Sequence, residues 1–221
     1  MKTVFITSTV KGLMMKYLGQ MALSMVLMSV GTTVMAIEET AYRVVKKDQQ
    51  FELRDYAPHV LAETIAEGDM GQAGNSSFRV LFRYITGSNQ SQTKVAMTAP
   101  VSQQPVSEKI SMTVPVSQQR MNDKWVVSFA MPAVYTLENA PKPTDARVVL
   151  RQVPARQVAS VTYSGLWTDK NYLQHKQELE AWIRKSGFSA SGEPVLARYN
   201  APLTPWFLRR NEVLIPVSKT P

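Results

Sequence analysis

The sequence predicts an α+β fold in which a curled sheet carries two helices on its outside. Short segments that are rich in β-branched and aromatic residues, each bounded by Pro, Gly, Asn or Asp, make up most of the chain. Two longer segments show helical periodicity instead. Because the order strand, strand, helix, strands occurs twice, we expect a duplicated α+β unit.

The first unit is expected to begin with three strands, at residues 42–46, 51–56 and 59–66. A helix is predicted at 71–86, because apolar residues recur there at positions i, i+3, i+4 and i+7. These residues are Phe78, Leu81, Phe82 and Ile85. Gly87 follows and can adopt the left-handed conformation that ends a helix.

A tight internal repeat comes next. The segment KVAMTAPVSQQ returns fifteen residues later as KISMTVPVSQQ. Apolar residues alternate with polar or small ones in both copies, which is the pattern of half-buried strands. We therefore expect a hairpin of two duplicated strands, 94–101 and 109–116. Pro100 and Pro115 should each mark an edge or a bulge, because proline cannot donate to a ladder.

The second unit has the same ingredients. Strands are expected at residues 125–131, 147–153, 157–164, 195–200 and 212–217, with a Pro-rich connection at 141–143. A helix is predicted at 169–186, where Thr168 can cap the start and Gly187 can end it.

The N-terminal segment is expected to lie outside this fold. The chain has 221 residues, 44% of them hydrophobic, which suits one globular domain. Its first 36 residues contain no acid, carry lysines and continue with an apolar run at 18–30, which is typical of a secretory signal peptide. We therefore expect cleavage after Ala36, a single domain at 37–221 and a periplasmic location. An uncleaved helix that anchors the protein to the inner membrane is the alternative.

Charge and cysteine content exclude several classes of protein. Loss of the signal peptide removes Lys2, Lys11 and Lys16 and lowers the formal net charge from +8 to +5. This charge could meet an anionic small molecule or a membrane surface, but there is no basic run, so we expect no nucleic-acid partner. Cysteine is absent, which excludes disulfides, thiolate metal sites, iron–sulfur clusters and covalently attached haem.

No residue pattern indicates catalysis or a metal site. The chain has no G-x-S-x-G elbow, no phosphate-binding Gly loop and no H-E-x-x-H motif. Its two histidines are far apart. His59 starts a predicted strand and is expected to face solvent, and His175 lies at the rim of the second helix's apolar stripe. We therefore expect neither catalytic residues nor metal ligands.

Two features could form a binding site. On the first helix, a rotation of 100° per residue places five residues on one strip: Asn75, Phe78, Arg79, Phe82 and Arg83. An aromatic strip edged by guanidinium groups suits a flat apolar ligand that carries carboxylates. In the alternative, the Phe residues pack inward and the Arg residues are solvated.

The second feature is the loop before the last strand. Pro202 and Pro205 hold it extended, and it carries Leu203, Trp206 and Phe207. So many large apolar residues in a Pro-stiffened loop either cover an edge of the core or line a ligand site.

Motifs along most of the chain resemble the SOUL haem-binding protein family. Between residues 42 and 217 they are YITGSN at 84–89, the doubled Met-Thr-x-Pro-Val at 97–101 and 112–116, FAMP at 129–132, the Pro-rich link before ARVVL, YSG at 163–165 and ARYNAP…RRNEV at 197–213. The resemblance implies a distorted antiparallel β-barrel of two pseudo-symmetric halves, each with one flanking helix. It also implies non-covalent binding of haem or another tetrapyrrole between the first helix and the loop before the last strand.

The resemblance also bears on individual residues. Where animal members have basic residues that are proposed to contact the haem propionates, this chain keeps Arg83 but has Asn75 and Thr204. Neither His59 nor His175 matches the family's axial histidine. We therefore expect haem to be held without a strong axial protein ligand.

The expected function is that of a non-catalytic binding protein that buffers or carries haem in the cell envelope. Two alternatives stay open. One is a module that binds an apolar small molecule without haem. The other is a small hydrolase, since the fold also resembles GyrI-like domains, some of which hydrolyse small molecules. The lack of an evident base and nucleophile counts against the hydrolase.

Overall fold

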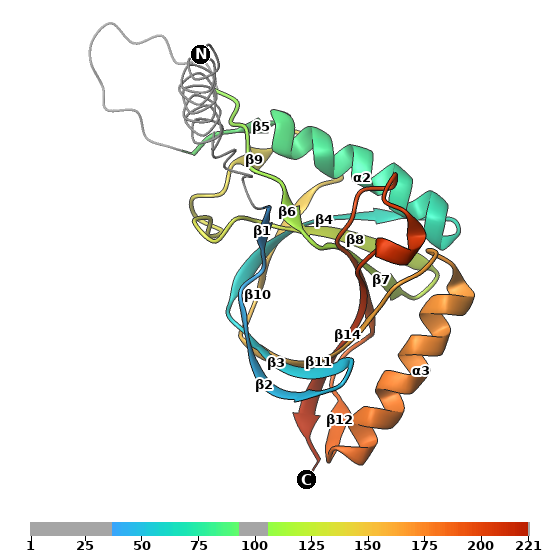
Figure 1. The fold of residues 1–221 in the computed structure, drawn as a ribbon. Coiled ribbons are helices and arrows are strands. Elements are labelled where there is room, and N and C mark those ends of the chain that lie inside the picture. Colours follow the sequence, from blue (N-terminus) through green and yellow to red (C-terminus); the bar gives the residue numbers. More distant parts are fainter. Residues whose placement is uncertain (1–36, 93–105, 221) are drawn as a thin grey trace, which may run out of the picture. The chain divides into compact units, whose positions relative to one another are not determined.

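The computed structural model describes residues 37–92 and 106–220, and it confirms the α+β class. One large antiparallel sheet carries two helices, α2 (Met70–Thr86) and α3 (Asp169–Lys185), as Figure 1 shows. The expected signal peptide lies outside the described residues, and so does the expected strand at 94–101. Within the described ranges, no helix is long and apolar enough to span a membrane.

The strands are short, and most of them form the main sheet. In chain order they are β1 (Glu38–Glu39), β2 (Tyr42–Asp48), β3 (Phe51–Tyr56), β4 (His59–Ala66), β5 (Asn89–Gln90), β6 (Thr113–Val114), β7 (Val116–Met121), β8 (Lys124–Ala130), β9 (Lys142–Pro143), β10 (Val149–Val153), β11 (Arg156–Tyr163), β12 (Phe188–Ala190), β13 (Val195–Arg198) and β14 (Asn211–Lys219). Two small pairs, β1 with β6 and β5 with β9, stand apart from the main sheet.

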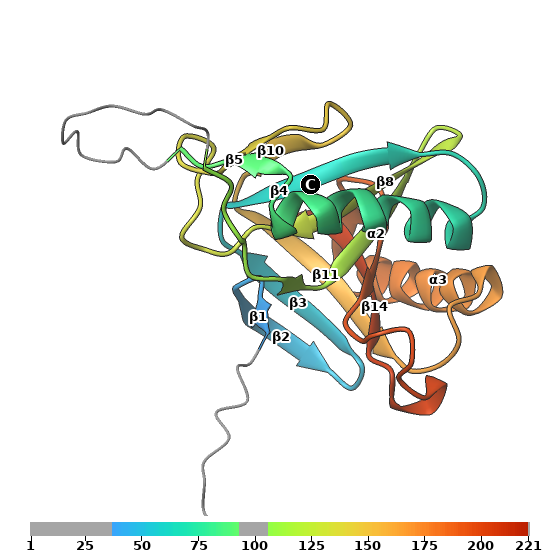
Figure 2. The same cartoon turned by 90° about the horizontal axis from the view of Figure 1, so that it is seen from above.

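The main sheet is strongly curved. Its strands follow the order β10, β4, β8, β7, β13, β14, β11, β3, β2, and β12 pairs with β14 at the side. Figures 1 and 2 show the strands curling around a concave face, with both helices on the convex side. No pairing within the described residues joins the edge strands β10 and β2, so the sheet is open by hydrogen bonding and the closed barrel stays a prediction.

The two helices begin and end within one residue of the predicted positions. The carboxylate of Asp69, which the sequence analysis did not identify as a cap, accepts a bond from the Gln72 N–H at 2.8 Å and starts α2. Gly87 ends α2 with a positive φ of 134°. Thr168 caps α3 as predicted, with its side chain accepting from the Asn171 N–H. The terminal signals in the sequence therefore specify both helices.

One predicted strand is wrong over most of its length. Of residues 109–116, Thr113–Val114 forms β6, which pairs in parallel with β1, and Val116 is the first residue of β7. Pro115 has no N–H to donate and separates β6 from β7. Ile110 packs in the core beneath α2 instead, and its N–H donates to the carbonyl of Ile85 at 2.8 Å. The other predicted strands in the described residues agree within two residues at each end.

Two apolar clusters lie between the helices and the convex face. Beneath α2, Leu81 and Tyr84 pack on Val127 and Phe129 of β8. Beneath α3, the cluster contains Leu179, Ile183, Val161 and Val213. Side chains of a strand alternate between faces, so the neighbours of these core residues point to the concave side. That side holds buried charges, among them Arg54 and Glu212.

Candidate functional site

The strip predicted on α2 is largely open to solvent. Its exposed members are Asn75, Arg79, Phe82 and Arg83. Phe78 is half-buried, stacks on Phe82 with 5.7 Å between the ring centroids, and meets Phe129 of β8 edge to face. Phe82 is 42% exposed, so the alternative in which both rings pack inward does not hold for Phe82.

The strip has an aromatic edge and a cationic edge. Phe78 and Arg83 are five residues apart, which places them about 140° apart around the helix axis. On the cationic side, Arg79 and Arg83 line a groove of about 250 Å³ together with Arg147. Neither Arg79 nor Arg83 forms an ion pair with another described residue, and Asp145, the acid whose charge acts on Arg83, is bonded to Arg147.

The loop between β13 and β14 presents apolar side chains to solvent. The most exposed are Leu203, Trp206, Phe207 and Leu208. Trp206 and Phe207 belong to the short 3-10 helix η1 (Trp206–Leu208) and contact each other edge to face. Arg209 fixes the loop, because its guanidinium donates to the carbonyl oxygens of Pro202 and Thr204 at 2.8 Å each. These apolar residues do not cover the core, which leaves them free to contact a ligand.

Three side chains connect α2 to this loop. The guanidinium groups of Arg198, on β13, and Arg209 lie over the ring of Trp167, 4.9 and 4.2 Å from its centroid. Trp167 is held by its indole N–H, which donates to Asn211 Oδ1 at 2.7 Å. At the α2 end, a Cβ on Gly74 would lie only 3.3 Å from Arg198 Nη1, so glycine allows this close approach. We call Arg198, Trp167 and Arg209 the Arg–Trp–Arg ladder.

Arg198 carries unused hydrogen-bonding capacity. Its Nε and Nη2 atoms and the Ser77 hydroxyl are the buried side-chain polar atoms that lack a partner in the described part of the chain. Burial lowers the pKa of Arg198 to about 10. Buried polar groups are almost always satisfied, and buried charges are almost always paired. Arg198 therefore suits an acceptor from outside the chain, such as a carboxylate or a water molecule.

Sequence reasoning did not identify the ladder as a site. Arg198 and Arg209 fall in the ARYNAP…RRNEV motif, and Trp167 follows YSG, but nothing in their spacing shows that they meet. They come together because β13 pairs with β7 on one side and β14 on the other. This pairing cannot be read from the order of the residues in the sequence. The sequence signal that could have indicated the ladder is the presence of two arginines near aromatic residues.

The histidines lie away from this surface or are engaged. His59 was expected to face solvent, but it is half-buried on the concave face, where burial lowers its pKa. His175 lies at the rim of α3 as expected; its ring stacks on Tyr163, and Nδ1 is 3.0 Å from Glu178 Oε2. In the described ranges, no three His, Asp or Glu residues cluster in a way that could hold a metal ion.

Comparisons with known proteins identify a family and similar folds. The family model described as SOUL heme-binding protein matches residues 37–216. Among solved structures, the C-terminal domain of EcmrR is 12% identical with a TM-score of 0.54, and the match covers 77% of this chain and 98% of that one. A hydrolase from Listeria innocua is 13% identical with a TM-score of 0.50, covering 79% and 94%. At such identities the likeness shows the fold alone. Comparison with curated proteins gives no match.

Proposed function

Because the chain belongs to the SOUL heme-binding protein family, we propose that it binds haem or a related tetrapyrrole on the surface between α2 and the loop before β14. The Arg–Trp–Arg ladder carries the proposal. It places a guanidinium with unsatisfied donors over the half-buried ring of Trp167 and connects the two segments that the sequence singled out. Flat apolar contacts with a few well-placed cations are what a carboxylated macrocycle requires.

The residues present fit such a ligand. Haem would bring a flat apolar ring, two carboxylates and an iron atom. The ring would contact the aromatic side chains of α2 and η1, which are Phe78, Phe82, Trp206 and Phe207, together with Leu203. The carboxylates would accept hydrogen bonds from Arg79, Arg83 or Arg198. A charge-assisted hydrogen bond of this kind contributes about 1.5–3 kcal/mol, and less where water and salt screen it.

A titration of the full chain with haemin, followed by the Soret band, tests the proposal. Phe82→Ala and Trp206→Ala remove half-exposed rings, so each should leave the fold intact and weaken binding by roughly tenfold. Val45→Ala is the matched control, because Val45 is equally exposed but lies on β2. Haemin binding that neither aromatic variant changes would place the ligand elsewhere. If haemin gives no spectral change while an apolar dye binds this surface, the chain is an apolar-ligand module without haem.

We infer a non-catalytic role in buffering or carrying haem. The support is the family, together with the engagement of the buried carboxylate of Glu212 on the concave face, which is bonded to Arg54. A carrier must also release its ligand. Binding on an exposed surface without a strong axial ligand allows release.

We also propose that the protein is exported and that the mature chain starts near Ile37. The acid-free, lysine-bearing segment with its apolar run supports this. Intact-mass analysis of the periplasmic fraction should find a chain that begins at Ile37. Recovery of a chain that begins at Met1 or Met15 from the membrane fraction would show an anchored protein instead.

A further inference from the structure

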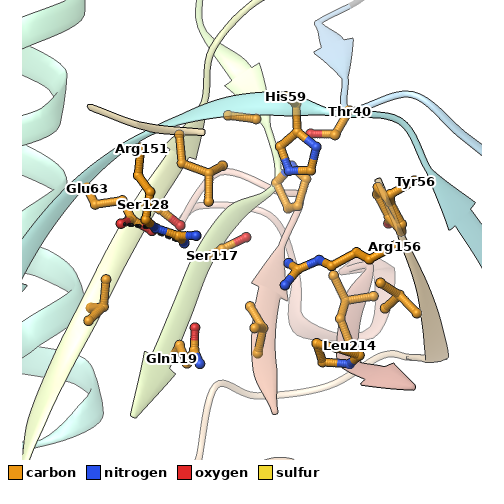
Figure 3. A pocket seen from close by; sticks show the side chains of 17 residues that line it. Thr40, Tyr56, His59, Glu63, Ser117, Gln119, Ser128, Arg151, Arg156 and Leu214 are labelled. Atoms are coloured by element: carbon orange, nitrogen blue, oxygen red, sulfur yellow. Dashed lines mark hydrogen bonds and ion pairs between the residues drawn. The ribbon is translucent and has the colours of Figure 1, made fainter. Parts of the chain in front are cut away.

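The concave face of the main sheet holds a cavity of about 60 Å³ that is partly open to solvent, and two of its lining residues, Arg151 and Arg156, are exposed; Figure 3 shows it from close by. Successive side chains of a strand point to opposite faces. On β8, Val127 and Phe129 therefore pack beneath α2, whereas Val126 and Ser128 line the cavity. The cavity and the haem surface proposed above consequently lie on opposite faces of the same sheet.

The cavity has an excess of basic groups. Arg151, Arg156 and His59 line it, and Glu63 is the one acid among its lining residues. Glu63 is already engaged, because Nε and Nη2 of Arg151 each donate to its carboxylate at 2.7 Å. The ring of His59 is also engaged, with Nδ1 2.8 Å from the carbonyl oxygen of Ala57.

Among these three basic groups, Arg156 is the one without a bonding partner in the described part of the chain. Its guanidinium makes no hydrogen bond or ion pair with any residue in the described ranges. Figure 3 shows this guanidinium and that of Arg151 extending from opposite sides into the same space. Burial and the nearby charge of Arg151 lower the pKa of Arg156 from its ordinary value. A cation held in this way has the geometry and the charge to receive an anion.

We propose that the cavity binds a small monocarboxylate, of the size of acetate or propionate, through Arg156. A guanidinium can donate two parallel hydrogen bonds to the two oxygens of a carboxylate. Leu61, Val126 and Leu214 form apolar walls that would contact the short alkyl chain of the acid. One unpaired cation matches one negative charge, which favours a monocarboxylate over a phosphate dianion.

The volume limits the length of the acid. One water-sized group needs roughly 10–15 Å³ of this kind of space, so a cavity of about 60 Å³ holds about four or five heavy atoms. Acetate has four heavy atoms and propionate has five. A six-carbon acid would exceed this volume, so part of its alkyl chain would lie outside the apolar walls. The site therefore selects acids by length as well as by charge.

The carboxylate could belong to a free acid or to a propionate of haem, which carries the same chemical group. The two sources are separable, because the cavity and the α2 strip use opposite faces of the sheet. A free acid in the cavity leaves haemin binding unchanged, whereas a haem propionate in the cavity would compete with it. The free acid is the proposed ligand, since the haem surface lies on the other face of the sheet.

The experiment is an isothermal titration of the full chain with sodium propionate, at constant ionic strength set by sodium chloride. Binding should saturate, and Arg156→Gln should weaken it at least tenfold, while its thermal melt stays that of the unaltered chain. The matched control is Arg43→Gln, which removes an exposed guanidinium bonded to Asp55 and should not change binding. Equal affinity in Arg156→Gln and in the unaltered chain overturns the proposal.

Three further arms keep the result decisive even if Arg156→Gln is less stable. Hexanoate should bind at least tenfold more weakly than propionate, and equal binding would show that this cavity is not the site. Inorganic phosphate that binds more tightly than propionate would overturn the choice of ligand. Saturation with haemin should leave propionate binding unchanged, and displacement would overturn the free acid. If haemin does not bind at all, the proposed function fails while the propionate result stands.

Discussion

Arg54 of β3 and Glu212 of β14 form a buried ion pair that spans the strand between them. Nη1 and Nη2 of Arg54 donate to the two carboxylate oxygens of Glu212 at 2.7 and 3.0 Å. Both residues are almost fully buried, and β11 separates their strands in the sheet. Tyr199 and Thr162 add hydroxyl donors to the same carboxylate. Together with Thr162, the ion pair therefore connects the strands β3, β11 and β14 on the concave side of the sheet.

Replacing Glu212 should destabilise the protein strongly. Glu212→Gln removes the more buried of the two acids that are paired with Arg54 and leaves it only the ion pair with Glu52. We therefore expect the free energy of unfolding to fall by about 3 kcal/mol, the lower end of the range for breaking a buried ion pair, in urea titrations at neutral pH. Glu67→Gln is the control, since the ion pair of Glu67 with Lys124 is exposed, and it should leave stability nearly unchanged. A Glu212→Gln variant as stable as the unaltered chain would contradict this account of the pair.

The same carboxylate should make stability depend on pH. Burial alone would raise the pKa of Glu212, but hydrogen bonds and charge from Arg54, with the charge of Arg210, hold it below its ordinary value of 4.5. Glu212 therefore binds a proton more readily in the unfolded chain than in the folded protein. The stability that its carboxylate contributes is complete above pH 4.5 and is lost as the pH falls through the lower pKa of Glu212 in the folded protein. Urea titrations across this range should show a smaller loss of stability in Glu212→Gln than in the unaltered chain.

Arg198 should contribute to ligand binding more than to folding. Arg198→Met keeps the length of the side chain but removes two buried nitrogen atoms that have no partner, so we expect stability to change by less than about 1 kcal/mol. Haemin affinity should fall by roughly tenfold. Arg120→Met, which also removes a guanidinium from the face of a tryptophan, Trp125, is the control and should bind haemin normally. Normal haemin binding in Arg198→Met with a large loss of stability would assign Arg198 a structural role.

The cationic edge of α2 should supply the salt-sensitive part of haem binding. Arg83→Ala should weaken haemin binding by roughly tenfold at low salt and by less at high salt, because screening reduces the charge-assisted bond. Arg79→Ala should add to this loss. Arg184→Ala, in the last turn of α3, is the control for a general loss of positive charge. If the double variant of α2 stays folded and binds haemin with unchanged affinity, the carboxylates do not lie at this edge.

Neither histidine should ligate the iron. His59 lies on the face of the sheet opposite α2, and the ring of His175 is occupied by Tyr163 and Glu178. His59→Ala and His175→Ala should therefore leave the Soret spectrum of the haemin complex nearly unchanged. A six-coordinate spectrum that disappears in either single variant would identify that histidine as an axial ligand.

Sequence reasoning reached the elements of the fold because their signals are local. Periodicity located both helices, and Thr168 and Gly87 marked ends that depend on backbone groups within a few residues. It missed pairs such as β5 and β9, whose strands are too short to show alternation. It also extended a strand through Pro115, where the lack of an N–H outweighs an alternating pattern. The same local reasoning grouped the residues of the α2 strip on one side of the helix, and the structure shows that all of them except the half-buried Phe78 are exposed.

By itself, the sequence determined the class of fold, the two helices with their ends, and the aromatic and cationic residues of α2 and of the last loop. The tertiary structure decided which distant residues meet. It joined Arg198 to Trp167 and Arg209, turned His59 toward a cavity, and left Arg156 facing that cavity without an acid. The physical reason is that strand order in the sheet differs from strand order in the chain. Contacts across β13, β14 and β11 therefore depend on pairing partners that no local pattern encodes.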